Sequence, residues 1–178
     1  MVTAAELLSL AAFLEGEYSQ AFPSFGSERM GAPVMAFCRI SQQPIRLREP
    51  VMQPDAVIVQ DPTLIHQVDL FEGLAADGFI LLNSTRDFEE LGLGEIVQKL
   101  PRGHCRTVPA SEFALKHVGR PLPNAALLGG FAGTTRQLTI ESVTAAIRER
   151  FPAKIAEGNV AAALEAYERT RERNLTHA

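Results

Sequence analysis

Cysteine is scarce in this sequence. Only two of its 178 residues are cysteine, and Cys38 and Cys105 lie far apart and outside any CxxC pattern. The chain therefore cannot hold an iron–sulfur cluster through the usual four thiolates. Two lone thiols favour packing roles in a reducing cytoplasm over a disulfide framework, so we expect a cytoplasmic protein.

Long runs of one kind of side chain are missing as well. The apolar stretches, such as Ala56–Val59 and Phe79–Leu82, are too short to span a bilayer. No positively charged region precedes the apolar residues at the N-terminus, so no signal peptide is expected. The 17 lysines and arginines are scattered through a chain of formal net charge −4. The sequence thus predicts neither a membrane partner nor a nucleic-acid partner.

A self-sufficient active site is also missing. The four histidines fall in no HxH or HExxH spacing, so no metal site is expected. The sequence has no GxSxG elbow and no Walker loop. It also lacks a Gly-Asp-Gly followed at a distance by Asn, the kind of pattern that holds thiamine pyrophosphate through a metal. We therefore expect the catalytic centre to lie outside this chain.

Strands that alternate with helices dominate what is present. Two apolar runs, Ala56–Gln60 and Gly78–Asn83, read as buried strands, and His104–Val108 reads as a third strand. Each is followed by a helix-start signal. Such units predict an α/β fold, a three-layer, doubly wound, mainly parallel sheet of Rossmann type. A composition with 46% hydrophobic residues suits one domain over residues 1–178.

Other segments are assigned by periodicity and caps. Ser84 with Asp87 resembles a capping pair. Asp61 precedes a proline that is suited to a first helical turn. Residues 168–178 read as a frayed C-terminal tail. Helices are predicted at Val2–Glu17, after Pro62, at Phe88–Leu100, Ser111–Val118, Asn124–Phe131, from Thr139 onward and at Ala153–Arg173, and short strands at Val34–Ile40 and Ile45–Leu47.

The beginning of the chain departs from the doubly wound pattern. Such a domain normally opens with a central strand and a glycine-rich turn ahead of the first helix. Here the helix comes first. Either the first strand is absent or the natural N-terminus lies further upstream. The second alternative is favoured, because a missing central strand would leave a gap in the sheet.

The loop Phe22–Pro33 holds the densest group of potential binding residues. Glycines permit tight turns, successive backbone N–H groups can cradle a phosphate, and an arginine fork suits phosphate oxygens. The loop could therefore bind a phosphorylated ligand or a partner, or it could be an ordinary surface connection with a solvated Glu28–Arg29 pair. Its candidate residues are Ser24, Gly26, Ser27, Arg29 and Gly31.

Several stretches, in order along the chain, closely resemble the gamma subunit, or gamma domain, of pyruvate/ketoisovalerate-type ferredoxin oxidoreductases. The matching stretches are Val2–Leu8, Ala21–Val34, Pro54–Leu64, Gly78–Asn83 and Pro121–Gly129, with Asn159 near the family's usual ending. Many matches in register are more specific than one motif. The "G.GGQG" turn that family members carry immediately before the positions matching Val2 and Thr3 is missing.

This resemblance implies a role inside a complex. The family oxidatively decarboxylates a 2-oxoacid on thiamine pyrophosphate and releases an acyl-coenzyme A. Catalytic alpha and beta subunits and a ferredoxin-like delta subunit would hold the thiamine cofactor, Mg and the 4Fe–4S clusters. The gamma chain, non-redox and not active alone, would present coenzyme A. Substrate choice lies at the thiamine site, so the 2-oxoacid and the acceptor, ferredoxin or NAD, are not set here.

The resemblance also implies site residues. The loop residues named above become candidates for the coenzyme A diphosphate, and Thr3 could face it because a helix N-terminus favours anions. Asn83 and Asn124 sit where doubly wound sheets bind ligands, although simple capping would also explain them. One alternative function is a purely structural or assembly subunit of the same complex without ligand contacts. Another is a free-standing nucleotide-binding protein.

Overall fold

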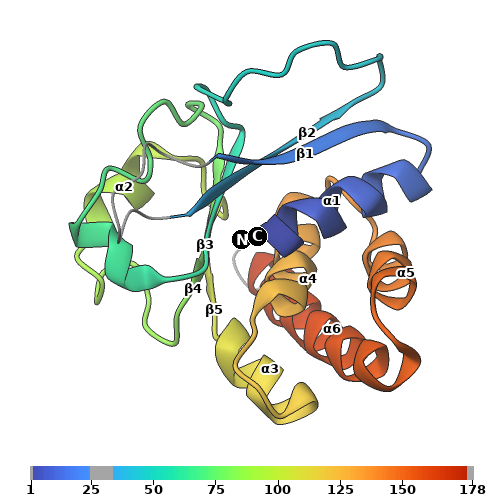
Figure 1. Cartoon of the computed structure of the whole chain (residues 1–178). Coiled ribbons are helices and arrows are strands. Elements are labelled where there is room, and N and C mark those ends of the chain that lie inside the picture. The colour runs from blue at the N-terminus through green and yellow to red at the C-terminus, as the bar shows by residue number, and fades with distance from the viewer. Residues whose placement is uncertain (1, 25–33, 176–178) are drawn as a thin grey trace.

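The computed structural model describes residues 2–24 and 34–175. A β-hairpin and a separate three-stranded parallel sheet are packed against a group of helices (Figure 1). The helices are α1 (Val2–Leu14), α2 (Gly94–Lys99), α3 (Ala110–Val118), α4 (Asn124–Thr135), α5 (Ile140–Arg150), α6 (Ala153–Leu175) and the 3₁₀ helix η1 (Pro62–His66), and the strands are β1 (Tyr18–Ser24), β2 (Met35–Ser41), β3 (Ala56–Val59), β4 (Phe79–Asn83) and β5 (Cys105–Val108).

The parallel sheet has the order β3-β4-β5, with Ala56 paired to Phe79 and Ile80 to Cys105. Its central strand β4 is buried on both faces, as its apolar run predicts. Leu81 packs into the core on the side of α4, whereas Leu82 points to the opposite face under η1 and α2. The predicted α/β class with parallel strands and helices is confirmed.

The hairpin of β1 and β2 is antiparallel and joined to α1. Ser24 pairs with Met35 at the end of the hairpin nearest residues 25–33, and Ser19 exchanges hydrogen bonds with Ser9 of α1 at 2.7 and 2.9 Å. The predicted loop start at Phe22 is therefore wrong, because Phe22–Ser24 belong to β1. Pro23 is tolerated since β1 pairs with β2 alone within the described residues. The central strand expected ahead of α1 stays a prediction.

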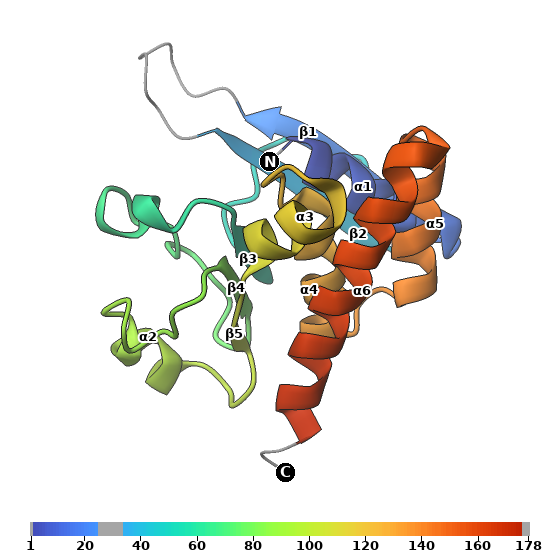
Figure 2. The same cartoon turned by 90° about the horizontal axis from the view of Figure 1, so that it is seen from below.

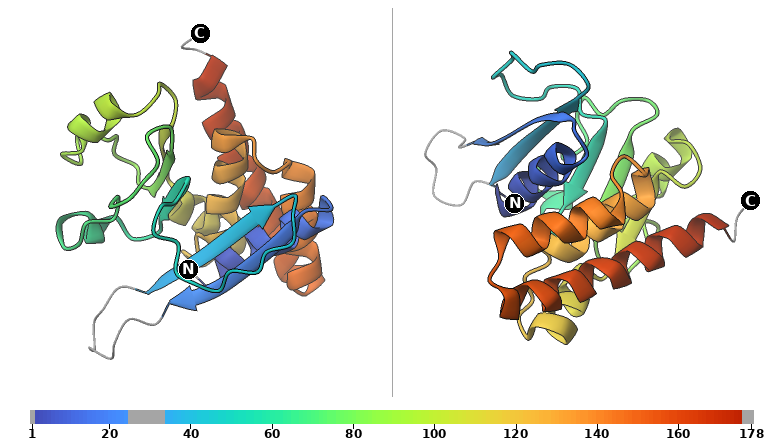
Figure 3. Two further views of the ribbon diagram at one scale, coloured as in Figure 1. Left: turned by 90° about the horizontal axis from the view of Figure 1, so that it is seen from above. Right: turned by 90° about the vertical axis from the view of Figure 1, so that its right-hand side faces the viewer.

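Helix α4 lies between the sheet and α6, and all its residues from Ala125 to Thr134 are buried (Figures 1 and 3). Gly130 faces Leu81 of the sheet. Gly129 lies directly on the backbone of α6, where a Cβ would come within 1.9 Å of the Ala163 carbonyl oxygen. The two helix backbones therefore approach as closely as they do only because no side chain separates them.

Two predicted elements differ in the structure. Ile45–Leu47 forms no strand, and the predicted helix Phe88–Leu100 is reduced to α2. Asp87 pairs with Glu90 rather than with Ser84, through the bonds Asp87 N to Glu90 Oε2 and Glu90 N to Asp87 Oδ1, each of 2.9 Å. The chain then turns at Gly92, whose φ of 75° few other residues adopt, so the helix starts only afterwards.

The other end signals agree better with the structure. Asp61 accepts a bond from Thr63 N at 2.9 Å and caps η1, as predicted. Thr139 accepts from Ser142 N at 3.2 Å and caps α5, as predicted. Helix α6 runs to Leu175, and Thr170 is buried against Gly133, so its packed part reaches beyond the predicted start of a frayed tail.

Candidate functional site

Asn83 joins three elements at the carboxyl end of the parallel sheet. It ends β4, and its Nδ2 donates to Gln60 O at 2.9 Å and to Ser111 Oγ at 2.8 Å. Its Oδ1 accepts from Ser111 N at 3.1 Å, in the first turn of α3. The side chain thereby fixes the end of β3 and the start of α3 relative to β4, at the edge where open α/β sheets bind ligands.

This arrangement corrects one prediction and adds two residues. The helix predicted from Ser111 begins at Ala110, and the Ser111 N–H is capped by Asn83. Gln60 and Ser111 were not predicted as site residues. Both are polar residues that come shortly after an apolar strand run, and that signal could have identified them.

We expect Asn83→Ala to lower the free energy of unfolding by about 1.5 kcal/mol. Three hydrogen bonds are lost, but the site is only half-buried, so water can satisfy the groups left behind. Chemical denaturation of the variant and the wild type measures the difference. An unchanged midpoint would show that this network does not stabilise the edge of the sheet.

Asn124 lies at the start of α4 and does not cap it. The N-cap position is Pro123, and Asn124 is the first helical residue, so the predicted capping role is wrong. Leu127 N bonds to Pro123 O at 2.8 Å, which leaves the earlier N–H groups of the helix without intrahelical partners. The Asn124 Oδ1 is buried without a hydrogen-bond partner. The unpaired N–H groups and the positive dipole end of this helix start suit an anion, whereas the Oδ1 atom, an acceptor, does not.

Thr3 and Ser24 lie on two other elements. Thr3 lies in the first turn of α1, and Ser24 ends β1 where the chain leaves for residues 25–33; both are half-buried. The N-terminal end of α1 lies beside the Ser24 end of the hairpin (Figures 2 and 3). The remaining loop candidates, Gly26, Ser27, Arg29 and Gly31, lie outside the described residues.

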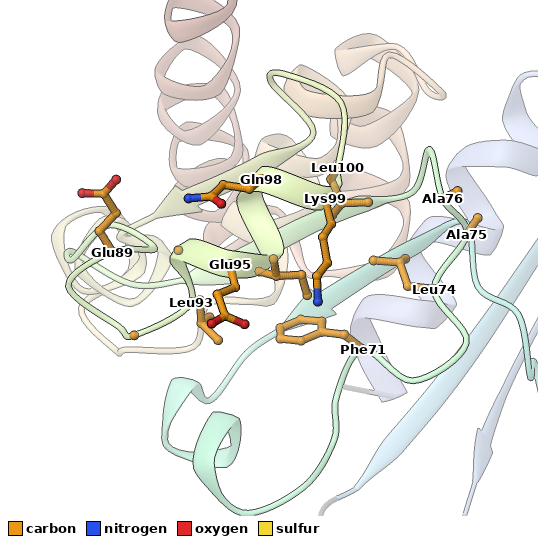
Figure 4. Close-up of a pocket in the computed structure, with 13 residues that line it drawn as sticks. Phe71, Leu74, Ala75, Ala76, Glu89, Leu93, Glu95, Gln98, Lys99 and Leu100 are labelled. Carbon is orange, nitrogen blue, oxygen red and sulfur yellow. The ribbon is translucent and has the colours of Figure 1, made fainter.

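An open cavity of about 860 Å³ lies on the opposite side of the parallel sheet (Figure 4). Its apolar lining comprises Phe71, Leu74, Leu93, Ile96 and Leu100. Its charged groups are Glu89, Glu95 and Lys99, so two carboxylates oppose one ammonium group. Such a lining does not suit a diphosphate, and no candidate residue contributes to it.

The two thiols are poor nucleophiles. Desolvation by burial raises the pKa of Cys38 to about 12. Burial also raises the pKa of Cys105, to about 11, although the nearby charge of Arg106 acts to lower it. We predict that both react at least about tenfold more slowly than free cysteine with a thiol reagent near neutral pH, because the thiolate reacts. A colorimetric thiol assay of folded and denatured protein measures this, and equal rates in the two states would contradict it.

Metal binding and membrane insertion depend on features that the described residues lack. No three His, Cys, Asp or Glu side chains of residues 2–24 and 34–175 lie close enough together to hold a metal ion. Within the same part of the chain, no helix is both long and apolar enough to cross a bilayer.

Comparison with known proteins gives one consistent family. Residues 1–169 match the family model described as pyruvate ferredoxin/flavodoxin oxidoreductase. The chain is 46% identical over 170 residues to the pyruvate synthase subunit PorC of Methanothermobacter marburgensis, covering 96% of this chain and 90% of that protein. It is 44% identical to the pyruvate/ketoisovalerate oxidoreductases common subunit gamma of Pyrococcus abyssi, again with 96% and 90% covered.

Solved structures agree with these sequence matches. The pyruvate oxidoreductase subunit PORC of Thermotoga maritima, EC 1.2.7.1, superposes with a TM-score of 0.74 at 33% identity, over 94% of this chain and 88% of that one. A second solved structure is the 2-oxoglutarate:ferredoxin oxidoreductase of Magnetococcus marinus, with 2-oxoglutarate, coenzyme A and succinyl-CoA bound. It has a TM-score of 0.67 at 13% identity, over 99% of this chain and 29% of that one. At this identity the likeness shows the fold alone. The chain therefore belongs to the pyruvate ferredoxin/flavodoxin oxidoreductase family, as a chain of the gamma-subunit type.

Proposed function

We propose that this chain is the gamma subunit of a thiamine pyrophosphate-dependent 2-oxoacid:acceptor oxidoreductase, in which it binds coenzyme A and supports assembly. The observation that carries the proposal is the start of α4, whose first-turn N–H groups have no intrahelical partners, in a chain that belongs to this family. Coenzyme A carries a diphosphate, and a helix N-terminus is suited to bind such an anion.

The proposed diphosphate site combines the starts of two helices with the hairpin loop. Thr3 and Asn124 contribute from the first turns of α1 and α4, and Ser24 from the end of β1. Ser27 and Arg29 would donate hydrogen bonds to phosphate oxygens, while Gly26 and Gly31 would permit close approach of the backbone. Asn83, whose amide is engaged with Gln60 and Ser111, would hold the sheet edge in place rather than contact the ligand directly.

In this proposal the catalytic chemistry belongs to partners. Alpha, beta and ferredoxin-like delta subunits hold thiamine pyrophosphate, Mg and the 4Fe–4S clusters, and thiamine supplies the cleavage of the 2-oxoacid. This chain binds and orients coenzyme A so that its thiol meets the acyl group, and contributes no general base or nucleophile. The assembly would operate in the cytoplasm, which suits two unpaired thiols.

An omission experiment tests this function. The complex is assembled from its subunits with and without this chain, and acyl-coenzyme A formation from a 2-oxoacid and coenzyme A is followed. Full activity is expected only when the chain is present, and none from the chain alone. Turnover of any 2-oxoacid by the isolated chain would overturn the proposal.

A purely structural subunit is the second candidate function, and it is favoured by the full hydrogen bonding of the Asn83 amide within the chain. In that case the loop 25–33 contacts a partner and no ligand. Isothermal titration of coenzyme A into the assembled complex and into a complex carrying Arg29→Ala separates the two. Equal affinities would favour the structural role.

A further inference from the structure

The two faces of the hairpin differ in what covers them. Tyr18 opposes Ser41, and Gln20 opposes Arg39, so all four side chains point to the same face, away from α1. The alternate residues face α1, where Ser19 bonds to Ser9 and Cys38 joins the main core. The connection from residue 42 to 55 passes over the side of the hairpin that faces away from α1 (Figures 1 and 3).

Large apolar side chains are concentrated on this side of the molecule. Eight large hydrophobic residues of the described chain are more than half exposed, and five of them lie on the hairpin or on the connection after it. We call the surface formed by Tyr18, Met35, Leu47 and Met52 the hairpin outer face; their exposed fractions run from 51% to 77%. A concentration of this kind marks an interaction surface, whereas single exposed apolar residues do not.

Two side-chain atoms beneath the hairpin outer face, one from Arg39 and one from Gln20, lack hydrogen-bond partners. The Arg39 guanidinium lies 5.7 Å from the Phe22 ring and donates one long bond, from Nη2 to Pro50 O at 3.4 Å. Its Nη1 and the neighbouring Gln20 Oε1 are buried without a hydrogen-bond partner. Buried polar groups in native structures are normally paired, so this pair points to a contact that the isolated chain does not supply.

The charge of this surface is positive overall. Residues 34–52 contain three arginines, Arg39, Arg46 and Arg48, and one acidic residue, Glu49, although the whole chain has a net charge of −4. Arg46 and Arg48 are exposed, and neither forms an ion pair within the described part of the chain. A partner with an excess of carboxylates complements this positive surface better than a second copy of the chain, which repeats the same excess of arginine.

We propose that the hairpin outer face docks against another subunit of the oxidoreductase complex, whose matching surface is apolar and carries carboxylates. This inference rests on the proposed function, since it requires a complex. Tyr18, Met35, Leu47 and Met52 form its apolar centre, as in interfaces generally. Arg46 and Arg48 meet the carboxylates at its rim, and Arg39 turns toward the partner to complete its hydrogen bonds.

Site-directed crosslinking in the complex tests this surface. Leu47→Cys and Met52→Cys are labelled with a benzophenone maleimide, and Leu164→Cys on α6, an exposed position away from the hairpin, is the matched control. Background labelling is low because burial raises the pKa of Cys38 and Cys105. Crosslinks from both hairpin positions to another subunit, at a segment with acidic residues, are expected. Crosslinks to a second copy of this chain, or none in the assembled complex, would overturn the proposal.

Charge and polarity variants provide a second, independent readout. The pair Leu47→Glu and Arg48→Glu should weaken association with the other subunits at least tenfold, with unchanged circular dichroism, whereas Leu164→Glu should not. Association unaffected by the pair would exclude the hairpin outer face and leave the proposed function intact. A wild-type chain that joins no thiamine-dependent complex would instead remove the proposed function itself.

Discussion

Gly129→Ala is expected to lower the free energy of unfolding by about 3 kcal/mol. A Cβ at this position would lie 1.9 Å from Ala163 O and 2.5 Å from its carbonyl carbon, both atoms of the α6 backbone. Helix backbones cannot yield as a flexible side chain can, so α4 and α6 must separate and the core between them must open. This strain outweighs the gain of about 1 kcal/mol that alanine brings to a helix interior.

Thermal unfolding measures this effect. In a chain of this size 1 kcal/mol corresponds to about 2–4 °C, so a fall of about 6–12 °C in Tm is expected. Gly94→Ala is the matched control, because the nearest atom to its new Cβ, Glu89 Cγ, lies 3.8 Å away in ordinary contact. If both variants unfolded together near the wild-type temperature, the close crossing of α4 and α6 would be wrong.

Arg29→Ala is expected to raise the KM of the assembled complex for coenzyme A by about 10- to 100-fold. The guanidinium would donate charge-assisted hydrogen bonds to the diphosphate, and the loss of such bonds costs about 1.5–3 kcal/mol. The KM for the 2-oxoacid should not change, because that substrate is bound by other subunits. Steady-state kinetics with either substrate varied gives both constants.

Two further variants separate a specific role of Arg29 from general charge. Arg29→Lys keeps the charge but loses the fork, so its KM for coenzyme A should be intermediate. Arg102→Ala removes an exposed arginine at the opposite, amino end of the strands and should leave both constants unchanged. A wild-type KM for coenzyme A in the intact Arg29→Ala complex would remove Arg29 from the site.

The parts of the fold that sequence could predict are those with strong local signals. The runs that form β3 and β4 are recognisable because each is short and apolar, and β5 is recognisable because a helix-start signal follows it at the same spacing. Strand β1 was missed because its alternation is weak and it contains Pro23, which an unpaired edge tolerates. The length of α2 depended on the positive φ of Gly92, and a helical pattern does not contain that information.

The candidate site was predictable as a set of positions but not as a network. The sequence placed Asn83 at a strand end, yet its partners Gln60 and Ser111 come from other elements and are set by tertiary packing. The sequence likewise indicated Asn124 as a cap, whereas the structure makes it the first helical residue with a buried, unpaired oxygen. Which polar group meets which depends on the sheet register, and local patterns do not determine it.

A structure of the assembled complex with coenzyme A bound would test the central claim most directly. The expected result is a coenzyme A diphosphate held by this polypeptide, with Ser27 or Arg29 within hydrogen-bond distance of it and the starts of α1 and α4 directed at it. The thiamine ring is expected to lie wholly in other subunits. Coenzyme A held entirely by those subunits, or a thiamine ring seated within this polypeptide, would contradict the claim.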